Sequence, residues 1–407
     1  MRPGRHLSLP EFVALMALLF ATVAFSTDAM LPGFPRIAAD LTPEAVNRVQ
    51  LMVTAFMLGL GVGTLFAGPL SDSYGRKAVV TAGLAIYMAG ALLAWLAQSL
   101  DLVLAARMIQ GLGAAGPRIA PMAMVRDLHE GRKMAQILSF ITTVFMLVPA
   151  LAPLAGAGII ALWGWRAIFA AFAVFALVGG LWLNLRQPET LPPERRRPFR
   201  PALIRAAVRE IVANPHVRRY TLVLTLGFAV LVALLSSTQQ IYDITFGRGE
   251  SFALWFALTA VLASSGTMLN AALVMRLGMR RLTRAAFAFQ TLFALVFLAL
   301  LTSGTLPGAA AFPAWFLWSF SIFFLAGLSF GNLTALALQP MGHVAGTAAS
   351  VVSAVSTILA VFIAVPIGLA FDGTPVPLLS GALVCAGLGW LLMRGSRDYE
   401  AEEAEPG

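Results

Sequence analysis

The chain has 407 residues, of which 59% are hydrophobic and only 12% are charged, and its formal net charge is +9. A soluble domain of this length needs a polar exterior, so this composition excludes a soluble globular protein and indicates a membrane protein. Apolar runs of about 20 residues, the length that spans ~30 Å of hydrocarbon, recur from end to end and predict helices. The sequence lacks the alternating segments of about ten residues that are typical of a membrane β-barrel.

Twelve such runs predict twelve transmembrane helices and therefore an all-α membrane protein. In chain order the expected spans are 10–33, 47–70, 78–98, 101–125, 134–160, 166–186, 219–241, 252–275, 284–304, 313–337, 346–371 and 376–394. A signal peptide is the alternative for the first span, because Arg2 and Arg5 precede it. The length of its apolar stretch and the helical hairpin that follows favour an uncleaved first helix.

Lysine and arginine are concentrated on one side of the predicted membrane. If both termini lie on that side, its loops hold most of the 28 basic residues, whereas the opposite loops hold only Arg36, Arg48, Arg166 and Arg248. The positive-inside rule then places both termini in the cytoplasm, as expected for a multi-pass protein of a bacterial inner membrane. These charges border helix ends, which suits contact with the lipid bilayer and argues against nucleic acid as a partner.

One long polar connection divides the chain nearly in half. It predicts an N-terminal six-helix bundle at 1–186, a basic cytoplasmic linker at 187–218, a C-terminal six-helix bundle at 219–394 and an acidic cytoplasmic tail at 395–407. Residues 202–213 have helical spacing that fits an amphipathic helix on the inner membrane surface, with a solvated linker as the equal alternative. The loops GPLSDSYGRK and MRLGMRRLTR sit at the same place in each half, as in a transporter built from two repeats.

Three charged residues, Asp28, Arg107 and Arg118, fall inside predicted spans. A charge in hydrocarbon is costly, so such residues face a cavity or a partner. Asp28 and Arg107 are expected at similar depth, where they could pair. Proton coupling or substrate contact is favoured over a static salt bridge, because buried pairs stabilise poorly. Arg118 stands between Pro117 and Pro121, and we favour the interpretation that it lines the central cavity. The alternatives are that the helix starts later in the chain, or that Arg118 donates a hydrogen bond to a carbonyl that a proline leaves without a partner.

The fifth span contains VPALAPLAGAGII, which combines prolines with small residues. Pro149 and Pro153 bend a helix, and Gly156 with its neighbouring alanines lets another backbone approach closely. We interpret this segment as an interface on which the two halves of a transporter slide as they rock.

Polar residues of the later spans are weaker candidates for a substrate cavity. Gln239 is the first choice among them. The others are Tyr242, Gln240, Asp243, Asn270 and Asn332, each of which could instead make an interhelical hydrogen bond.

Together these segments resemble the major facilitator superfamily, in particular its drug:proton antiporter branch of the bicyclomycin-resistance (Bcr/CflA) type. GPLSDSYGRK is similar to the superfamily's gating loop motif, matched at Gly68, Leu70, Asp72, Gly75, Arg76 and Lys77, although Ser73 stands where arginine is usual. RDLHEGRKMA implies that Arg126 and Asp127 belong to the same gating motif. ARMIQGLGAA resembles the helix-four motif, which implies proton coupling for Arg107 and a place in the substrate cavity for Gln110.

Other segments are similar to the branch rather than to the whole superfamily. STDAMLP resembles its first-helix signature, with Asp28 at the acidic position, and WRAIF, HVAGTAAS and FDGTPVPL are further signals. VPALAPLAGAG resembles the antiporter motif, whose prolines and glycines control the switch between states. Relatives often carry arginine at the place of Met122, whereas here Arg118 stands one turn earlier, which puts the usual drug spectrum in doubt.

The resemblance implies two pseudo-symmetric six-helix bundles and a proton-coupled multidrug efflux transporter that works by alternating access, as a monomer. Its partners would be a small-molecule substrate, protons and the bilayer. An enzyme, an ATP pump and a bound cofactor or metal are not expected, because the sequence has no nucleotide-binding loop, no metal-ligand cluster and a single cysteine, Cys385. The alternatives are a dedicated carrier for an amino-acid-like or anionic metabolite, which Arg118 favours, and a sensor of the same fold that does not transport.

Overall fold

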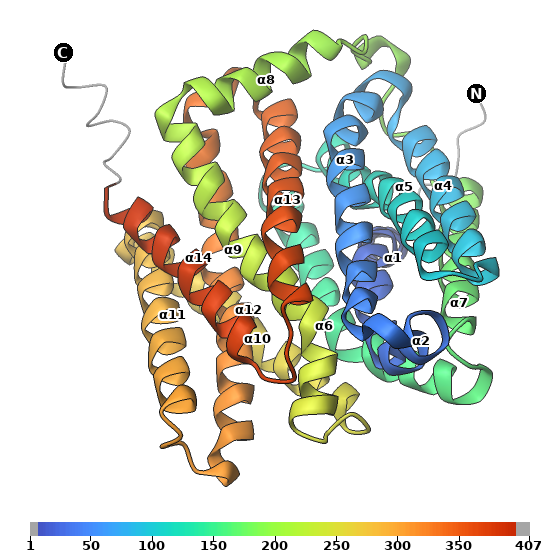
Figure 1. Cartoon of the computed structure of the whole chain (residues 1–407). Coiled ribbons are helices and arrows are strands. Elements are labelled where there is room, and N and C mark those ends of the chain that lie inside the picture. Colours follow the sequence, from blue (N-terminus) through green and yellow to red (C-terminus); the bar gives the residue numbers. More distant parts are fainter. Residues whose placement is uncertain (1–6, 396–407) are drawn as a thin grey trace. The chain divides into compact units, whose positions relative to one another are not determined.

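The computed structural model describes residues 7–395 (Figure 1). These residues form helices joined by turns, with no strand among them, as the apolar runs predicted. Arg2, Arg5, Arg397 and the predicted acidic tail beyond Gly395 lie outside the described residues, as do the side chains of 343–345 in HVAGTAAS.

The described residues contain eleven helices that are long and apolar enough to cross a membrane. The one predicted span that is not among these eleven is the fourth, which corresponds to α5 (Leu100–Leu128), and its 29 residues are ample for a bilayer. It is less apolar than the others because Arg107, Gln110 and Arg118 lie in its middle turns. The helix that departs from the apolar pattern is therefore the one that holds most of the predicted site.

The chain forms two compact units. The first comprises the residues up to Pro201 together with Ser251–Ala257, and the second comprises Ala202–Glu250 and the chain from Leu258 onward. Besides α5, the first unit contains α1 (Leu9–Asp28), η1 (Leu31–Gly33), α2 (Phe34–Leu41), η2 (Pro43–Gln50), α3 (Leu51–Tyr74), α4 (Arg76–Leu96), α6 (Gly131–Trp163), α7 (Ala167–Arg186) and η3 (Pro193–Arg195).

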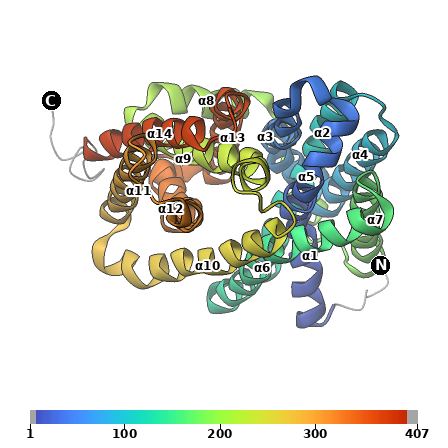
Figure 2. The same ribbon diagram turned by 60° about the horizontal axis from the view of Figure 1, so that its bottom comes forward.

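The remaining elements are α8 (Pro201–Ala213), α9 (Pro215–Gln240), the π-helical turn η4 (Ile241–Thr245), α10 (Phe252–Leu277), α11 (Met279–Thr302), α12 (Gly308–Leu338), η5 (Gln339–Val344), α13 (Ala345–Leu369) and α14 (Val376–Arg394). Figure 2 shows α11 and α14 side by side within the second unit. Asn332 of α12 donates to Asn270 of α10 at 2.8 Å. These two candidates therefore make the interhelical hydrogen bond that was their alternative interpretation.

The connection after the first span is itself helical, which the hydropathy pattern did not indicate. Helix α2 is a short amphipathic helix that buries Phe34 and Ile37. Its Asp40 carboxylate accepts a 2.7 Å hydrogen bond from the Trp165 indole, and the Arg166 guanidinium lies 3.8 Å from the same carboxylate oxygen. The WRAIF segment thus anchors α2 to the start of α7.

Helices α3, α4 and α5 lie side by side (Figure 1) because glycines remove the side chains at their crossings. A Cβ at Gly111 would overlap the carbonyl oxygen of Phe56 in α3, and a Cβ at Gly113 would overlap the backbone of Tyr87 and Gly83 in α4. This close approach puts the side chains that precede Gly111 on α5 directly against the neighbouring backbones.

Helix α8 coincides closely with the amphipathic stretch expected at 202–213, so the predicted helical spacing is confirmed for this stretch. Ile204, Ala207 and Ile211 are buried, whereas Arg205 and Arg209 are exposed. The burial of this apolar stripe within the protein means that the stripe itself is not available to the membrane.

Helix α6 packs against α1 through one side of its small-residue segment. A Cβ at Gly156 would overlap the carbonyl oxygen of Ala29, the residue that follows Asp28, whereas a Cβ at Gly158 meets no atom within 4 Å. Pro153 is buried on the same side as Gly156. Of the small residues predicted to let another backbone approach α6, those on the face that includes Gly156 therefore pack against α1.

Gly156→Ala should lower the thermal stability of the purified chain by several degrees, because overpacking a tight contact costs about 1–3 kcal/mol. Gly158→Ala is the matched control two residues away and should leave the melting temperature unchanged. Size-exclusion chromatography after heating measures both. Equal melting temperatures for the two variants would contradict the packing of Gly156 on α1.

Candidate functional site

The Arg107 side chain is fully buried and is held by three helices of the first unit. Its Nη2 donates to the Ser26 carbonyl of α1 at 3.0 Å, and its Nε donates to the Met52 carbonyl of α3 at 3.3 Å. Its Nη1 donates to the Gln110 side-chain oxygen one turn along α5. The guanidinium also lies over the ring of Phe56, 4.4 Å from its centroid.

A second polar contact joins α1 to α4 beside this arginine. The Ser26 hydroxyl donates to the Thr22 carbonyl of its own helix, so its single hydrogen is used. The fully buried Tyr87 hydroxyl contacts the Ser26 oxygen and must therefore be the donor of that hydrogen bond. Tyr87 and Arg107 thus hold the same turn of α1. Tyr87 binds the Ser26 hydroxyl, and Arg107 binds the Ser26 backbone carbonyl.

Asp28 is the last residue of α1 and only 4% exposed. The structure does not pair it with Arg107: among residues 7–395 no ion pair joins Asp28 to a basic side chain. Arg107 instead binds the Ser26 carbonyl, two residues earlier in α1. Asp28 lies on α1 and Arg107 contacts α1 two residues away, as expected from their similar depths, but no Asp28–Arg107 ion pair is present in the described chain.

Arg118 lies farther along α5 and is half-buried. In the part of the chain that the structure describes, its guanidinium has neither a hydrogen bond nor an ion pair. A hydrogen bond to a carbonyl freed by Pro117 or Pro121 is therefore wrong, and α5 is continuous through both prolines. An unpaired guanidinium is suited to bind a carboxylate or phosphate.

Gln239 belongs to α9 in the second unit and is 2% exposed. Its side-chain oxygen has no hydrogen-bond partner within the described chain. Buried polar atoms normally have a partner, so this amide oxygen is available to a water molecule or a ligand donor.

The gating loop motif turns sharply between α3 and α4. Gly75 has φ +102°, a backbone conformation that disfavours residues with a side chain, and this turn brings Asp72 and Arg76 together as an ion pair. Arg76 Nε also donates to Asp127 at the end of α5 at 3.0 Å. Arg126 lies outside this cluster: it is exposed, and among the residues that the structure describes it donates to the Met122 carbonyl of its own helix.

The start of the linker completes the cluster, which the motif alone did not predict. The Glu189 carboxylate accepts the backbone N–H groups of Arg76 at 3.0 Å and Lys77 at 3.1 Å, so it caps α4. Thr190 donates to Asp127 at 2.9 Å, and Arg197 N–H donates to the Asp72 carbonyl at 3.0 Å.

Lys77 ties the same loop to the end of α7. Its ammonium donates to the carbonyls of Asn184 and Gln187, both at 3.0 Å. The remaining motif residues, Gly68 and Leu70, are half-buried on α3 and take no part in these contacts. We call the segment 187–197 the strap, because it binds the ends of α3, α4 and α5 from one side.

Three residues of these networks escaped the sequence reasoning. Tyr87 is a lone tyrosine in an apolar span, and Ser26 precedes the aspartate of STDAMLP by two residues. Glu189 is the first acidic residue after α7, more than a hundred residues from Arg76. A polar residue in an apolar span and an acid beside a helix end are weak signals, and only the fold shows their partners.

No cluster of three His, Cys, Asp or Glu side chains in the described residues is arranged to bind a metal ion. The site therefore consists of buried hydrogen-bonding groups and two arginines in α5, Arg107 and Arg118. Such groups can bind protons and polar solutes.

Comparisons with known proteins agree on one family. The model of the family described as Major Facilitator Superfamily matches residues 16–365. The chain is 30% identical over 352 residues to the "Bicyclomycin resistance protein homolog" of Haemophilus influenzae, covering 84% of this chain and 85% of that protein. It is 30% identical over 235 residues to the "Multidrug resistance protein MdtL" of Salmonella heidelberg, covering 57% of this chain and 58% of that protein.

Solved structures show the same fold. The crystal structure of a D-xylose-proton symporter aligns with a TM-score of 0.77 at 15% identity, covering 95% of this chain and 97% of that one. The human organic anion transporter MFSD10 aligns with a TM-score of 0.63 at 18% identity, covering 95% of this chain and all of that one. At such identities the likeness concerns the fold alone, and it confirms the predicted all-helical transporter architecture.

Glu189→Gln should free the start of α4, because an amide presents one acceptor oxygen where the carboxylate uses two and has no charge to offer the helix N-terminus. Losing about 1–2 kcal/mol of local stability corresponds to roughly 5- to 30-fold faster amide exchange. Hydrogen–deuterium exchange of peptides that cover residues 72–82 measures this change. Glu194→Gln, at an exposed position of the same strap, is the control; equal exchange in both variants would contradict the cap.

Proposed function

The chain belongs to the Major Facilitator Superfamily, and we propose that it is a proton-coupled exporter of drugs or similar small molecules that works by alternating access. It is a multi-pass membrane protein. The printed names of two relatives, which refer to bicyclomycin and multidrug resistance, support efflux over uptake. The bias of its basic residues supports a place in the bacterial inner membrane with both termini in the cytoplasm.

The observation that carries the proposal is the burial of Asp28 without a cation. Burying an unpaired carboxylate is costly, and binding a proton removes that cost. The group therefore changes charge in response to its surroundings, which is the property that proton coupling requires. When a cavity opens to water, Asp28 releases its proton; when the cavity closes, the proton is retained.

Arg107 is suited to detect this change. Its Nη2 is bound to the Ser26 carbonyl, so a charged Asp28 two residues away competes for the same guanidinium. We propose that Arg107 exchanges the carbonyl for the carboxylate when Asp28 loses its proton. The exchange moves the end of α1 relative to α5.

The motion is transmitted to α6, the helix that contains the antiporter motif VPALAPLAGAG. The carbonyl of Ala29 lies against Gly156 of α6, so the end of α1 cannot shift without α6. Pro149 and Pro153 provide a place for α6 to bend. In this proposal the ion pairs of Arg76 with Asp72 and Asp127 keep the ends of α3, α4 and α5 together while the bundles rock.

Arg118 favours a second candidate, a carrier for an anionic metabolite. Its guanidinium has no partner among the described residues, and a substrate carboxylate or phosphate would supply one. For a drug exporter, the same residue would bind the acidic or carbonyl oxygen of the drug, with Gln110 of the same helix as a further contact. Gln239, in the second unit, stays a predicted substrate contact.

Inverted membrane vesicles that hold this chain should accumulate bicyclomycin or another exported drug when a proton gradient, acid inside, is imposed. Asp28→Asn keeps the shape but cannot ionise, so gradient-driven uptake should fall at least about tenfold, to the level seen with a protonophore. Asp101→Asn, at an exposed surface ion pair, is the control and should transport normally. Undiminished gradient-driven uptake by a well-folded Asp28→Asn variant would refute proton coupling at this residue.

Arg118→Gln separates the two candidates. If the substrate is an anion, this variant should bind it about tenfold or more weakly, because a charge-assisted contact is lost, and Arg118→Lys should recover part of the affinity. If the substrate is a neutral drug, the same variant should change its affinity only a few-fold. Tryptophan fluorescence titration of the purified chain with anionic and neutral compounds provides the measurement.

A further inference from the structure

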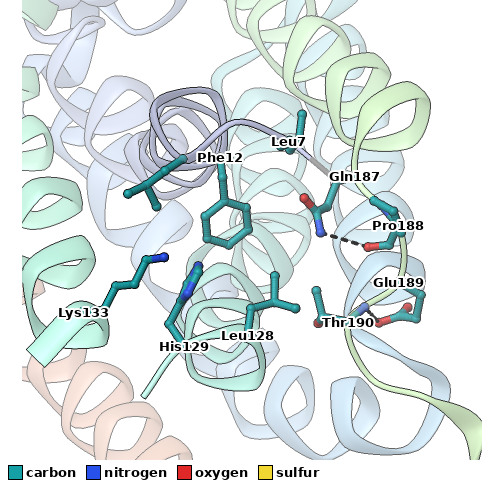
Figure 3. A pocket seen from close by; sticks show the side chains of 10 residues that line it. Leu7, Phe12, Leu128, His129, Lys133, Gln187, Pro188, Glu189 and Thr190 are labelled. Atoms are coloured by element: carbon teal, nitrogen blue, oxygen red, sulfur yellow. Dashed lines mark hydrogen bonds between the residues drawn. The ribbon is translucent and has the colours of Figure 1, made fainter. Parts of the chain in front are cut away.

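The first unit has a cavity at the opposite end of α1 from Asp28 (Figure 3). Its volume is about 410 Å³. Its walls come from the start of α1, the end of α5, the first turn of α6 and the strap: Leu7, Leu9, Phe12, Leu128, His129, Lys133, Gln187, Pro188, Glu189 and Thr190. None of these residues takes part in the proton or substrate contacts proposed above.

The cavity has an apolar middle and one basic side. Phe12 stands in its middle, packed edge to face against the His129 ring at 5.8 Å between centroids, with Leu128 beside it (Figure 3). The ammonium of Lys133 lies at the rim and makes no ion pair within the described chain. Burial and the nearby Lys133 ammonium hold the pKa of His129 below its ordinary value, so the ring is neutral at pH 7 and offers a hydrogen bond.

Glu189 is the only acidic residue among the lining residues, and both of its carboxylate oxygens already accept hydrogen bonds. One carboxylate oxygen accepts the N–H of Arg76 and the other accepts the N–H of Lys77. Glu189 is therefore engaged at the start of α4, where the helix N-terminus favours a negative charge. The basic group that faces the cavity is the Lys133 ammonium, which can pair with an anion.

The level of the cavity in the bilayer follows from its neighbours. At the same end of α1, Glu11 binds Arg186 at 2.9 Å and accepts a 3.2 Å hydrogen bond from the Trp182 indole of α7. Tryptophan and arginine at the end of a spanning helix are typical of the headgroup region. A ligand that enters from there has a charged head and an apolar body.

We propose that this cavity binds an anionic phospholipid, with its phosphate at Lys133 and His129 and its glycerol and upper acyl part against Phe12, Leu9 and Leu128. The proposal requires only that the chain spans a membrane, and it does not depend on proton coupling or on the transported substrate. Gln187–Thr190 form the wall opposite Lys133 (Figure 3).

A lipid in this cavity acts on the gating loop, because the wall that it contacts is the strap. Glu189 caps α4 and Thr190 donates to Asp127, so holding residues 187–190 in place also holds those two contacts. Occupancy therefore stabilises the strap against local opening. The lipid becomes a regulator of the loop that joins α3 to α4.

The test uses the full chain, purified, delipidated and titrated with phosphatidylglycerol or with phosphatidylcholine of the same acyl chains. Native mass spectrometry counts bound lipids, and hydrogen–deuterium exchange reports on residues 187–191. We expect phosphatidylglycerol to bind more tightly and to slow exchange of the strap. Lys133→Gln should weaken that binding about fivefold and remove the protection, whereas Arg132→Gln, its exposed neighbour outside the cavity, should do neither.

Leu128→Trp fills the cavity and should abolish tight binding of phosphatidylglycerol even with Lys133 intact. Asp28→Asn should bind the lipid normally, which separates this proposal from the transport mechanism. Equal weakening by Lys133→Gln and Arg132→Gln would show general attraction to the surface and overturn the site. Equal binding of the two lipids, or strap protection by inorganic phosphate alone, would overturn an anionic phospholipid as the ligand.

Discussion

The burial of one guanidinium constrains the whole first unit. Arg107 is 0% exposed and no carboxylate forms an ion pair with it in the described chain, so backbone carbonyls and the Phe56 ring must compensate its charge. Carbonyls reach it only where α1 and α3 come very close to α5. The glycines of α5 and α3 permit the approach of α3 to α5, because a Cβ at Gly111 or Gly59 would overlap a facing backbone. The arginine and the glycines of this motif are thus two parts of one packing solution.

The same constraint makes the end of α1 sensitive to charge. Ser26 is held twice, by Arg107 at its carbonyl and by Tyr87 at its hydroxyl, and Asp28 follows within one turn. A carboxyl group placed beside a well-satisfied cation can compete for it only when ionised. The structure therefore separates a firmly held turn of α1 from a carboxyl group that can disturb it. Gly156 places the backbone of α6 against Ala29, the residue that follows Asp28, so a shift of this turn also moves α6.

Much of this arrangement could be predicted from the sequence, and the failures have physical causes. Span lengths follow from bilayer thickness, so the helices came out within a few residues, and α8 followed from the spacing of Ala207 and Ile211. The depth of Asp28 and Arg107 followed from the helical rise. Which group on α1 meets the guanidinium depends on rotation about the helix axes, and no pattern along one chain reports that angle. The Ser26 carbonyl took the place expected for Asp28.

The strap illustrates a different failure. The motif predicted that Asp72 and Arg76 act together, and resemblance added Asp127, but Glu189 lies over a hundred residues away in a segment that reads as a polar linker. Its role depends on the first N–H groups of α4, which any helix start leaves without partners. Sequence patterns describe side chains, whereas this contact is made to the backbone. Arg126 shows the converse: a charged side chain beside Asp127 in sequence is exposed and, within the described chain, binds the Met122 carbonyl of its own helix. Contacts that hold loops together are therefore best sought at helix starts. Their free N–H groups bind an acidic side chain, which can come from a distant part of the sequence.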